Sequence, residues 1–220
     1  LIPLAGGNTG VQMAGWFNKE INSLEDLQGL KMRIPGLGGE VFQRAGGTAV
    51  NIPGGEIYTS LQTGTIDATE WVGPYNDLAF GLHQVAKYYY YPGWQEPGPT
   101  LEIIVNKAAM SSLPADLQEI VRVASRAMND DMLAEFTTRN NAALEDLVNK
   151  HHVQLRRLPD DVLAKLKVIS AEVVKSIAQD DELAQRIYRS YDRYRTQVMS
   201  YHEISERAYI NARATQPPAH

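Results

Sequence analysis

Arg33 is placed where it could bind an anionic ligand. It lies in Leu30–Pro35, a run that alternates apolar with basic residues and therefore predicts a β-strand ending at a proline. Its side chain is expected on the face opposite Met32 and Ile34. Ligands of open α/β sheets bind at the carboxyl ends of strands, and the glycine-rich residues 36–39 follow directly. A guanidinium matches a carboxylate with a planar pair of donors, although a surface arginine on an edge strand fits the pattern equally well.

Two further segments place aromatic and polar side chains together at predicted strand ends. Glu70 and Trp71 lie near the end of a predicted strand over residues 66–72. Trp94–Glu96 follows a second predicted strand and lies in a loop rich in proline and glycine. Aromatic side chains beside polar groups are typical of pocket walls, but the pattern alone favours ordinary core tryptophans.

Other chemical motifs are weak or missing from the sequence. Residues 36–39 begin like a dinucleotide-binding loop, but Val41 stands where that motif needs glycine, so a tight strand-to-helix turn is expected. No Gly-x-Ser-x-Gly motif and no cysteine is present, which excludes a nucleophile elbow, thiolate chemistry and disulfides. The histidines lack zinc-protease spacing and are expected at the surface; they are His83, His151, His152, His202 and His220.

Composition limits the classes of protein to consider. The chain has 220 residues, 44% of them hydrophobic, enough for one large domain or two small lobes with a packed core. The net charge of −5 argues against nucleic acid as a partner, because binding phosphates needs a basic surface. No apolar run approaches the roughly 18 residues that span a membrane. The chain begins at Leu1 without a methionine, which we interpret as a processed or truncated product.

The first half of the chain alternates short strands with short helices. This β-α-β-α-β order predicts an α/β fold with a parallel or mixed sheet. The predicted strands are Leu30–Pro35, Ala49–Ile52, Ile66–Val72, Tyr88–Tyr91 and Leu101–Val105, and the predicted helices are Glu40–Ala45, Glu56–Thr63 and Asp77–Lys87.

Residues 112–213 contain little glycine or proline and predict long helices. Ser112–Pro114 begins the first of them, and a strand is expected at His152–Leu158, before a helix that starts after Pro159. The last helix carries a narrow apolar row at spacings of three and four residues: Leu183, Ile187, Tyr191, Tyr194, Val198 and Tyr201. Such a row packs along another helix, either within one subunit or between two copies in a homodimer.

Four stretches together resemble a known family. They are Gly6–Met13, Leu27–Gly36, Gly64–Tyr75 and Tyr88–Trp94. They are similar to the solute-binding subunits of tripartite ATP-independent periplasmic (TRAP) transporters. Within that family they look closest to the branch that binds 2-oxo and 2-hydroxy monocarboxylates with a metal ion.

The resemblance implies a role for each of five residues. Arg33 matches the arginine that pairs with the ligand carboxylate. Gln12 and Glu70 through side-chain oxygens, and Trp71 through its backbone oxygen, match the groups that bind the cation and surround the ligand. Gln95 is implied to touch the ligand from a neighbouring loop. Ligation by oxygen alone suits a hard cation such as Na⁺ or Ca²⁺.

The implied fold is a two-lobed periplasmic binding protein with mixed sheets and long C-terminal helices, whose N-terminal part is absent from this chain. Residues 1–70 and 110–150 are expected in the second lobe, residues 71–109 in the remaining part of the first lobe, and residues 151–213 in bracing helices. Residues 214–220 are expected to form a frayed tail.

The implied function is periplasmic capture of a small carboxylate such as pyruvate or lactate, by hinge closure, and its delivery to membrane permease subunits of a TRAP transporter. The chain is not expected to be an enzyme. Two alternatives stay open at this point: an enzyme acting on 2-oxo acids with Glu70 as the base, and an extracellular ligand-sensing domain.

Overall fold

The computed structural model describes residues 1–179 and 181–214. The chain divides into two compact units, Leu1–Ser170 and Ala171–His220. The frayed tail predicted from residue 214 onward lies, from residue 215, outside the described residues. All of the predicted ligand-binding residues belong to the first unit.

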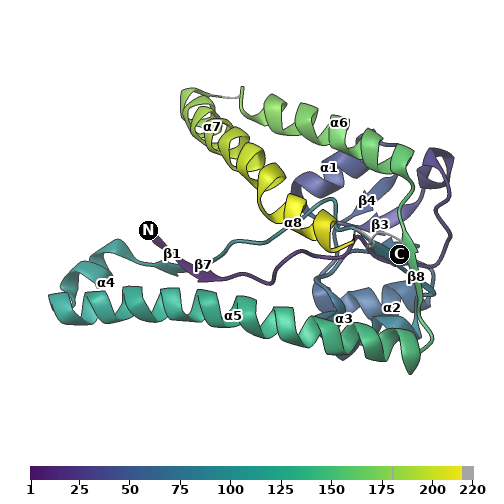
Figure 1. The fold of residues 1–220 in the computed structure, drawn as a ribbon, viewed down its shortest axis with the longest axis horizontal. Coiled ribbons are helices and arrows are strands. Elements are labelled where there is room, and N and C mark those ends of the chain that lie inside the picture. The colour runs from purple at the N-terminus through teal and green to yellow at the C-terminus, as the bar shows by residue number, and fades with distance from the viewer. Residues whose placement is uncertain (180, 215–220) are drawn as a thin grey trace, which may run out of the picture. The chain divides into compact units, whose positions relative to one another are not determined.

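Six short strands form a mixed sheet in the first unit (Figure 1). The strand order is β4-β3-β5-β2-β6-β8. Strand β3 runs parallel to β4 and β5, whereas β2 runs antiparallel to β5 and β6, and β8 runs parallel to β6. The predicted α/β class with a mixed sheet is therefore confirmed. The strands are β2 (Gly15–Phe17), β3 (Lys31–Arg33), β4 (Thr48–Val50), β5 (Ala68–Thr69), β6 (Tyr88–Tyr91) and β8 (Gln154–Arg157).

The centre of this sheet brings two distant segments to the same edge. Arg33 of β3 is in register with Thr69 of β5, so Glu70, the next residue, lies beside the end of β3. On the other side of β5, Gly15 of β2 has a φ of +130°, and a Cβ there would meet the Thr69 carbonyl oxygen at 2.2 Å. Only glycine fits this close approach, which fixes the backbone immediately before Glu70.

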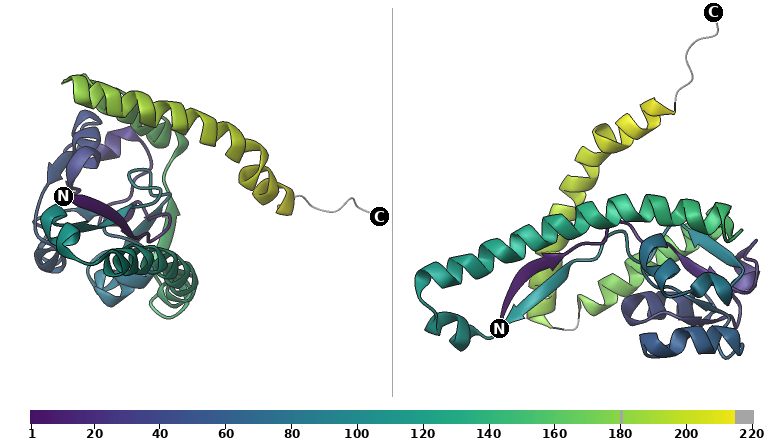
Figure 2. Two further views of the ribbon diagram at one scale, coloured as in Figure 1. Left: turned by 90° about the vertical axis from the view of Figure 1, so that its left-hand side faces the viewer. Right: turned by 90° about the horizontal axis from the view of Figure 1, so that it is seen from below.

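A second, two-stranded sheet lies along the longest helix (Figures 1 and 2). Strand β1 (Ile2–Gly7) pairs antiparallel with β7 (Leu101–Val105), and α4 (Lys107–Ser112) leads from β7 to α5 (Ala115–Asn149). Strand β1 packs on α5, where Gly7 leaves room for Met132: a Cβ at Gly7 would meet its sulfur at 2.4 Å.

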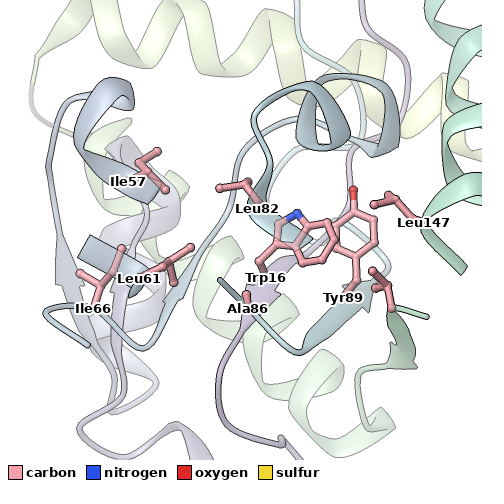
Figure 3. Packing of buried hydrophobic residues seen from close by; sticks show 9 residues of the cluster. Trp16, Ile57, Leu61, Ile66, Leu82, Ala86, Tyr89 and Leu147 are labelled. Atoms are coloured by element: carbon pink, nitrogen blue, oxygen red, sulfur yellow. The ribbon is translucent and has the colours of Figure 1, made fainter. Parts of the chain in front are cut away.

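The hydrophobic core of the first unit is centred on an aromatic stack (Figure 3). The rings of Trp16 and Tyr89 are stacked with their centroids 4.0 Å apart, and Leu147 of α5 is fully buried in the same cluster. The short helical segments around the sheet are η1 (Leu24–Leu27), α1 (Gly36–Arg44), η2 (Gly54–Glu56), α2 (Ile57–Gln62), α3 (Pro74–Ala79) and η3 (Leu82–Gln84).

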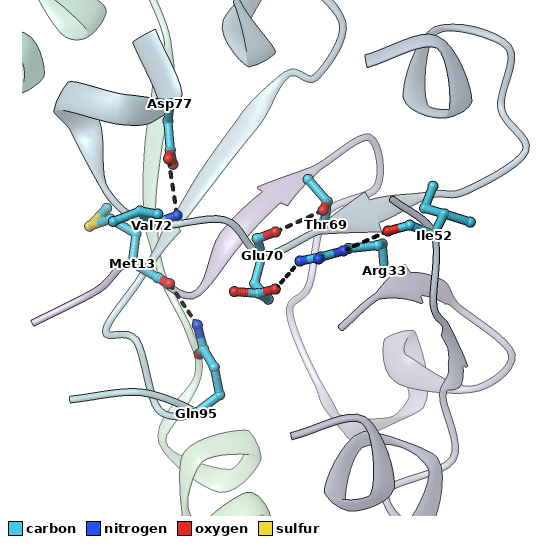
Figure 4. Close-up of polar contacts among 8 residues, drawn as sticks. All are labelled: Met13, Arg33, Ile52, Thr69, Glu70, Val72, Asp77 and Gln95. Atoms are coloured by element: carbon cyan, nitrogen blue, oxygen red, sulfur yellow. Dashed lines mark hydrogen bonds and ion pairs between the residues drawn. The ribbon is translucent and has the colours of Figure 1, made fainter. Parts of the chain in front are cut away.

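Asp77 of α3 joins this aromatic stack to the loop that follows Glu70. One carboxylate oxygen accepts hydrogen bonds from Trp16 Nε1 (2.9 Å) and the Tyr89 hydroxyl (2.7 Å). The other accepts the backbone N–H group of Val72 at 3.2 Å (Figure 4) and that of Gly73 at 3.0 Å. Burial raises the pKa of Asp77 to about 6, against the lowering effect of these four donors.

Three helices follow β8: α6 (Asp160–Ile177), α7 (Glu182–Ile204) and α8 (Glu206–Arg213). Helix α6 begins with two acids in its first turn, as predicted after Pro159, and Asp181 caps α7 by accepting the backbone N–H of Ala184 at 2.7 Å. Within the described ranges, no helix is both long and apolar enough to cross a membrane.

Several element boundaries differ from the sequence prediction. The glycines of residues 36–39 form the first turn of α1 instead of a separate turn. The helix predicted at Asp77–Lys87 is divided into α3 and η3, because Gly81 has a φ of +73° between them. Strands β1 and β2 were not predicted, since β1 contains proline and paired glycines and β2 has only 3 residues.

The lobe boundaries predicted from the sequence remain a prediction. Strands β5 and β6 lie on either side of the boundary expected at residues 70 and 71, and both pair with β2 in the same sheet. The six-stranded sheet is thus continuous across that boundary.

Candidate functional site

A buried ion pair forms the centre of the candidate site (Figure 4). Arg33 Nη1 donates to Glu70 Oε1, with only 12% of the arginine side chain and 7% of the glutamate side chain exposed. Arg33 Nε donates to the carbonyl oxygen of Ile52, which follows β4, at 3.4 Å. This hydrogen bond holds the plane of the guanidinium. Elsewhere among the described residues, each ion pair includes an exposed partner, so this pair is set apart by its burial.

Glu70 carries its charge at an electrostatic cost. Burial is the main cause that raises its pKa to about 7, Arg33 opposes the rise, and the carboxylates of Glu96 and Asp77 add to it. Burial raises the pKa of Glu96 as well. A single arginine therefore does not compensate this group of acids, and a further cation at Glu70 would be favourable.

The ring of Trp71 packs against the guanidinium of Arg33. Arg33 Cζ lies 5.5 Å from the centroid of the Trp71 ring, within the range of a cation–π interaction. The same ring contacts Phe80 at a centroid distance of 4.8 Å, and Gly54 leaves space for it, because a Cβ there would meet the ring at 2.9 Å. Trp71 Nε1 is buried and has no hydrogen-bond partner within the protein.

Gln12 and Gln95 lie in two segments that hydrogen-bond to each other. The backbone N–H of Gly93 donates to the Gln12 carbonyl oxygen at 3.1 Å, and Gln95 Nε2 donates to the Met13 carbonyl oxygen at 2.9 Å. Both side-chain oxygens, Gln12 Oε1 and Gln95 Oε1, are buried without a partner. A buried oxygen that lacks a donor is costly unless a ligand or ion satisfies it.

These groups fit a hard cation better than a transition metal. Over residues 1–179 and 181–214, no cluster of three or more His, Cys, Asp or Glu residues could hold a metal. The predicted ligands are instead one carboxylate (Glu70), one amide oxygen without a partner (Gln12 Oε1) and a backbone oxygen (Trp71). A set composed only of oxygens suits Na⁺ or Ca²⁺.

Three contributors to this region carry little or no signal in the sequence. The Ile52 carbonyl holds Arg33, but backbone groups leave no signal in residue type. Asp77 holds residues 72 and 73, and its helical position gave no indication of burial. Thr9 is buried and its hydroxyl has no partner; its position in the Gly6–Met13 stretch, beside Gln12, was the only available signal.

Comparisons with known proteins agree on one family. Residues 3–181 match the model of the bacterial extracellular solute-binding protein family 7. A protein of Nostoc sp. named as a monocarboxylate 2-oxoacid-binding periplasmic protein is 42% identical over 211 residues, covering 96% of this chain and 58% of that protein.

Solved structures of TRAP solute-binding proteins have the same fold. The protein from Pseudoalteromonas atlantica, with bound sodium and pyruvate, has a TM-score of 0.88 at 44% identity, covering 95% of this chain and 64% of that one. The protein from Colwellia psychrerythraea, with bound calcium and pyruvate, has a TM-score of 0.90 at 44% identity, covering 96% and 64%. The protein from Bordetella bronchiseptica, a dimer with calcium and picolinate, has a TM-score of 0.91 at 35% identity, covering 97% and 65%.

The chain thus spans roughly three fifths of the length of these relatives. The family match nevertheless covers most of the chain and includes both the sheet and the buried ion pair. The chain belongs to the bacterial extracellular solute-binding protein family 7, the family of TRAP transporter solute-binding proteins.

Proposed function

We propose that this chain binds a small 2-oxo or 2-hydroxy monocarboxylate together with Na⁺ or Ca²⁺ in the periplasm, for delivery to the membrane permease subunits of a TRAP transporter. The buried Arg33–Glu70 ion pair is the observation that carries the proposal. Pyruvate bound with sodium or calcium in two relatives of 44% identity supports both the ligand class and the ions.

Arg33 and Glu70 exchange partners when the ligand binds. Glu70 now occupies the Nη1 edge of the guanidinium, where it takes the place that a ligand carboxylate would have. When Glu70 moves away, Arg33 can donate both of its terminal N–H groups to the ligand carboxylate, while the Ile52 carbonyl keeps the guanidinium plane in position.

Gln12, Glu70 and the Trp71 backbone oxygen would hold the cation. A bound Na⁺ or Ca²⁺ supplies the positive charge that lets Glu70 and a ligand carboxylate occupy one desolvated site. Gln12 Oε1 would gain the partner that it lacks within the protein. Gln95 Oε1 and Trp71 Nε1 remain available to the ligand as an acceptor and a donor.

We propose binding without chemical turnover. Glu70 is paired with Arg33 in the ligand-free chain and would bind the cation in the complex, so it is a poor general base in either state. Of the two acids near it, Asp77 already accepts four hydrogen bonds. Pyruvate or lactate incubated with the protein should therefore be recovered unchanged, as followed by proton NMR.

Replacing Arg33 with lysine tests the carboxylate contact. Lysine keeps the charge but loses the planar pair of donors, so Arg33→Lys should weaken pyruvate binding in Ca²⁺ by at least about tenfold, or about 1.4 kcal/mol. Titration calorimetry measures the affinity. Arg44→Lys is the matched control, because Arg44 is an exposed arginine paired with Glu40 on the surface of α1. Equal affinity in wild type and Arg33→Lys would rule out the assignment.

The cost of charging Glu70 predicts a pH dependence of stability in metal-free protein. The pKa of Glu70 is raised from 4.5 to about 7 and that of Asp77 from 3.8 to about 6. At pH values between the ordinary pKa and the raised pKa of each acid, the folded chain binds more protons than the unfolded chain. The free energy of unfolding therefore falls as the pH rises through these two ranges. Above pH 6 or so the fall comes mainly from Glu70, and Glu70→Gln should flatten that part of the curve.

Urea unfolding at pH 5–8 with a chelator present measures this difference, and tryptophan fluorescence is a suitable signal because Trp16, Trp71 and Trp94 all lie in the first unit. Below pH 6 both acids contribute to the fall, so in Glu70→Gln only the part caused by Asp77 should persist there. A variant with the same slope as wild type between pH 6 and 7 would show that Glu70 is not the destabilised acid.

We also propose that α7 mediates a homodimer. Its apolar row is solvent-exposed in the single chain, with Ile187 60%, Tyr191 53% and Tyr194 68% exposed, and a second copy of the helix would cover it. The dimer reported for the Bordetella relative supports this partner.

Light scattering tests the dimer. Wild type should have twice the mass of the chain, and the double variant Ile187→Glu, Tyr194→Glu should have the mass of one chain, with Arg193→Glu as a control on the polar side of α7. A monomeric wild type at micromolar concentration would contradict the proposal.

A further inference from the structure

A polar pocket lies apart from the candidate carboxylate site and shares no residue with it. Its volume is about 460 Å³. It is formed by segments just after β2, at the end of α2, around η3, before β6, and between α5 and β8. Its lining residues are Asn18, Gln62, His83, Gln84, Val85, Ala86, Lys87, His151, His152, Val153 and Gln154.

The pocket lining is basic although the chain as a whole is acidic. It contains one lysine and three histidines but no aspartate or glutamate, whereas the chain has a net charge of −5. His152, with a φ of +55°, turns the chain from α5 toward β8 and so places two of these histidines at the pocket.

Two glutamines of the lining have their side-chain oxygens engaged within the protein. Gln84 Oε1 accepts the Tyr58 hydroxyl at 3.2 Å, and Gln154 Oε1 accepts Arg156 Nη2 at 2.8 Å. With their oxygens engaged, the two amide groups have N–H donors left for a ligand. Although three histidines line the pocket, no group of three or more His, Cys, Asp or Glu side chains in the described part of the chain could hold a metal ion, so a ligand rich in acceptors fits this wall better than a metal cation.

His83 and His151 form a close pair whose charging needs a counter-ion. Their ring centroids are 4.2 Å apart with the planes inclined at 46°, and His83 Nδ1 is buried without a partner. Burial and the neighbouring His151 lower the pKa of His83, because two imidazolium groups at this distance repel each other. An anion bound beside both rings would remove this repulsion.

None of the residues that line the pocket is an acid that could serve as the counter-ion of this pair. Lys87 and His152 are exposed members of the lining, and Lys87 adds a cationic side chain to it. Asp146, a carboxylate in the last turn of α5, is paired with Lys150 at 2.7 Å and does not line the pocket.

We propose that this pocket binds a small oxyanion of at least two negative charges, of the sulfate or phosphate class, between His83, His151 and Lys87. Binding and histidine protonation reinforce each other, so the affinity rises as the pH falls below the usual histidine range near about 6.5.

Inorganic sulfate is a suitable probe, because its charge is constant over the pH range tested. Proton–carbon NMR of the imidazole groups follows a sulfate titration of the whole chain at constant ionic strength. We expect saturable shifts of His83 and His151 at pH 6, and binding at least about tenfold weaker at pH 8. The signal of His202, a histidine of α7 that lies outside the pocket, should not move.

The variants His83→Gln and Lys87→Met should each weaken sulfate binding at pH 6 by at least about fivefold, while His202→Gln should leave it unchanged. Lys87→Met also covers the case that His83→Gln fails to fold, because Lys87 is exposed. Shifts that do not saturate, that affect His202 equally, or that persist unchanged in Lys87→Met would overturn the proposal.

Discussion

Arg33 of β3 and Glu70, the residue that follows the neighbouring parallel strand β5, form an ion pair with both charged groups largely withdrawn from water. Neither charge would be tolerated there alone, since removing one partner leaves an uncompensated buried charge. The pair is nevertheless incompletely balanced, because burial and two other carboxylates keep the pKa of Glu70 near 7. A site with this surplus of negative charge attracts a cation, and a guanidinium held by its own glutamate can exchange that glutamate for another carboxylate.

The surrounding structure holds this pair in place by close backbone packing. Gly15 lets β2 approach the backbone at Thr69, and Gly93 lets the loop after β6 approach Gln12, whose carbonyl oxygen a Cβ there would meet at 2.2 Å. Asp77 anchors residues 72 and 73 to the aromatic core. The backbone on both sides of Glu70 is therefore fixed, and the side chains of Arg33 and Glu70 are the parts that can change partner.

Local sequence patterns predicted part of this site. The alternation around Arg33 placed Met32 and Ile34 in the core and left the arginine facing the other way, as the structure has it. Residue periodicity could not identify Gln12, because it lies in the loop between β1 and β2. Only the family resemblance pointed to it. The Ile52 carbonyl and the Gly15 contact depend on the pairing of segments distant in the sequence, which periodicity does not specify.

The histidine pocket also depends on contacts between distant segments, which local sequence patterns do not predict. The adjacent residues His151 and His152 gave no reason to expect a site, because neighbours in a strand or helix face different ways. The pair that forms is His83 with His151, which come from segments 68 residues apart in number and meet only because α5 returns to the sheet at β8. The sequence prediction of surface histidines holds for His151 and His152, whereas His83 is half-buried.

The exchange of partners by Arg33 and Glu70 is tested most directly by the Ca²⁺ dependence of pyruvate affinity, measured by calorimetry in wild type and in Glu70→Gln. We expect Ca²⁺ to tighten pyruvate binding to wild type by at least about tenfold relative to chelator, a coupling of about 1.4 kcal/mol, and most of this coupling to disappear in Glu70→Gln. Pyruvate affinity that is the same with Ca²⁺ and with chelator, or a full coupling that persists in Glu70→Gln, would contradict it.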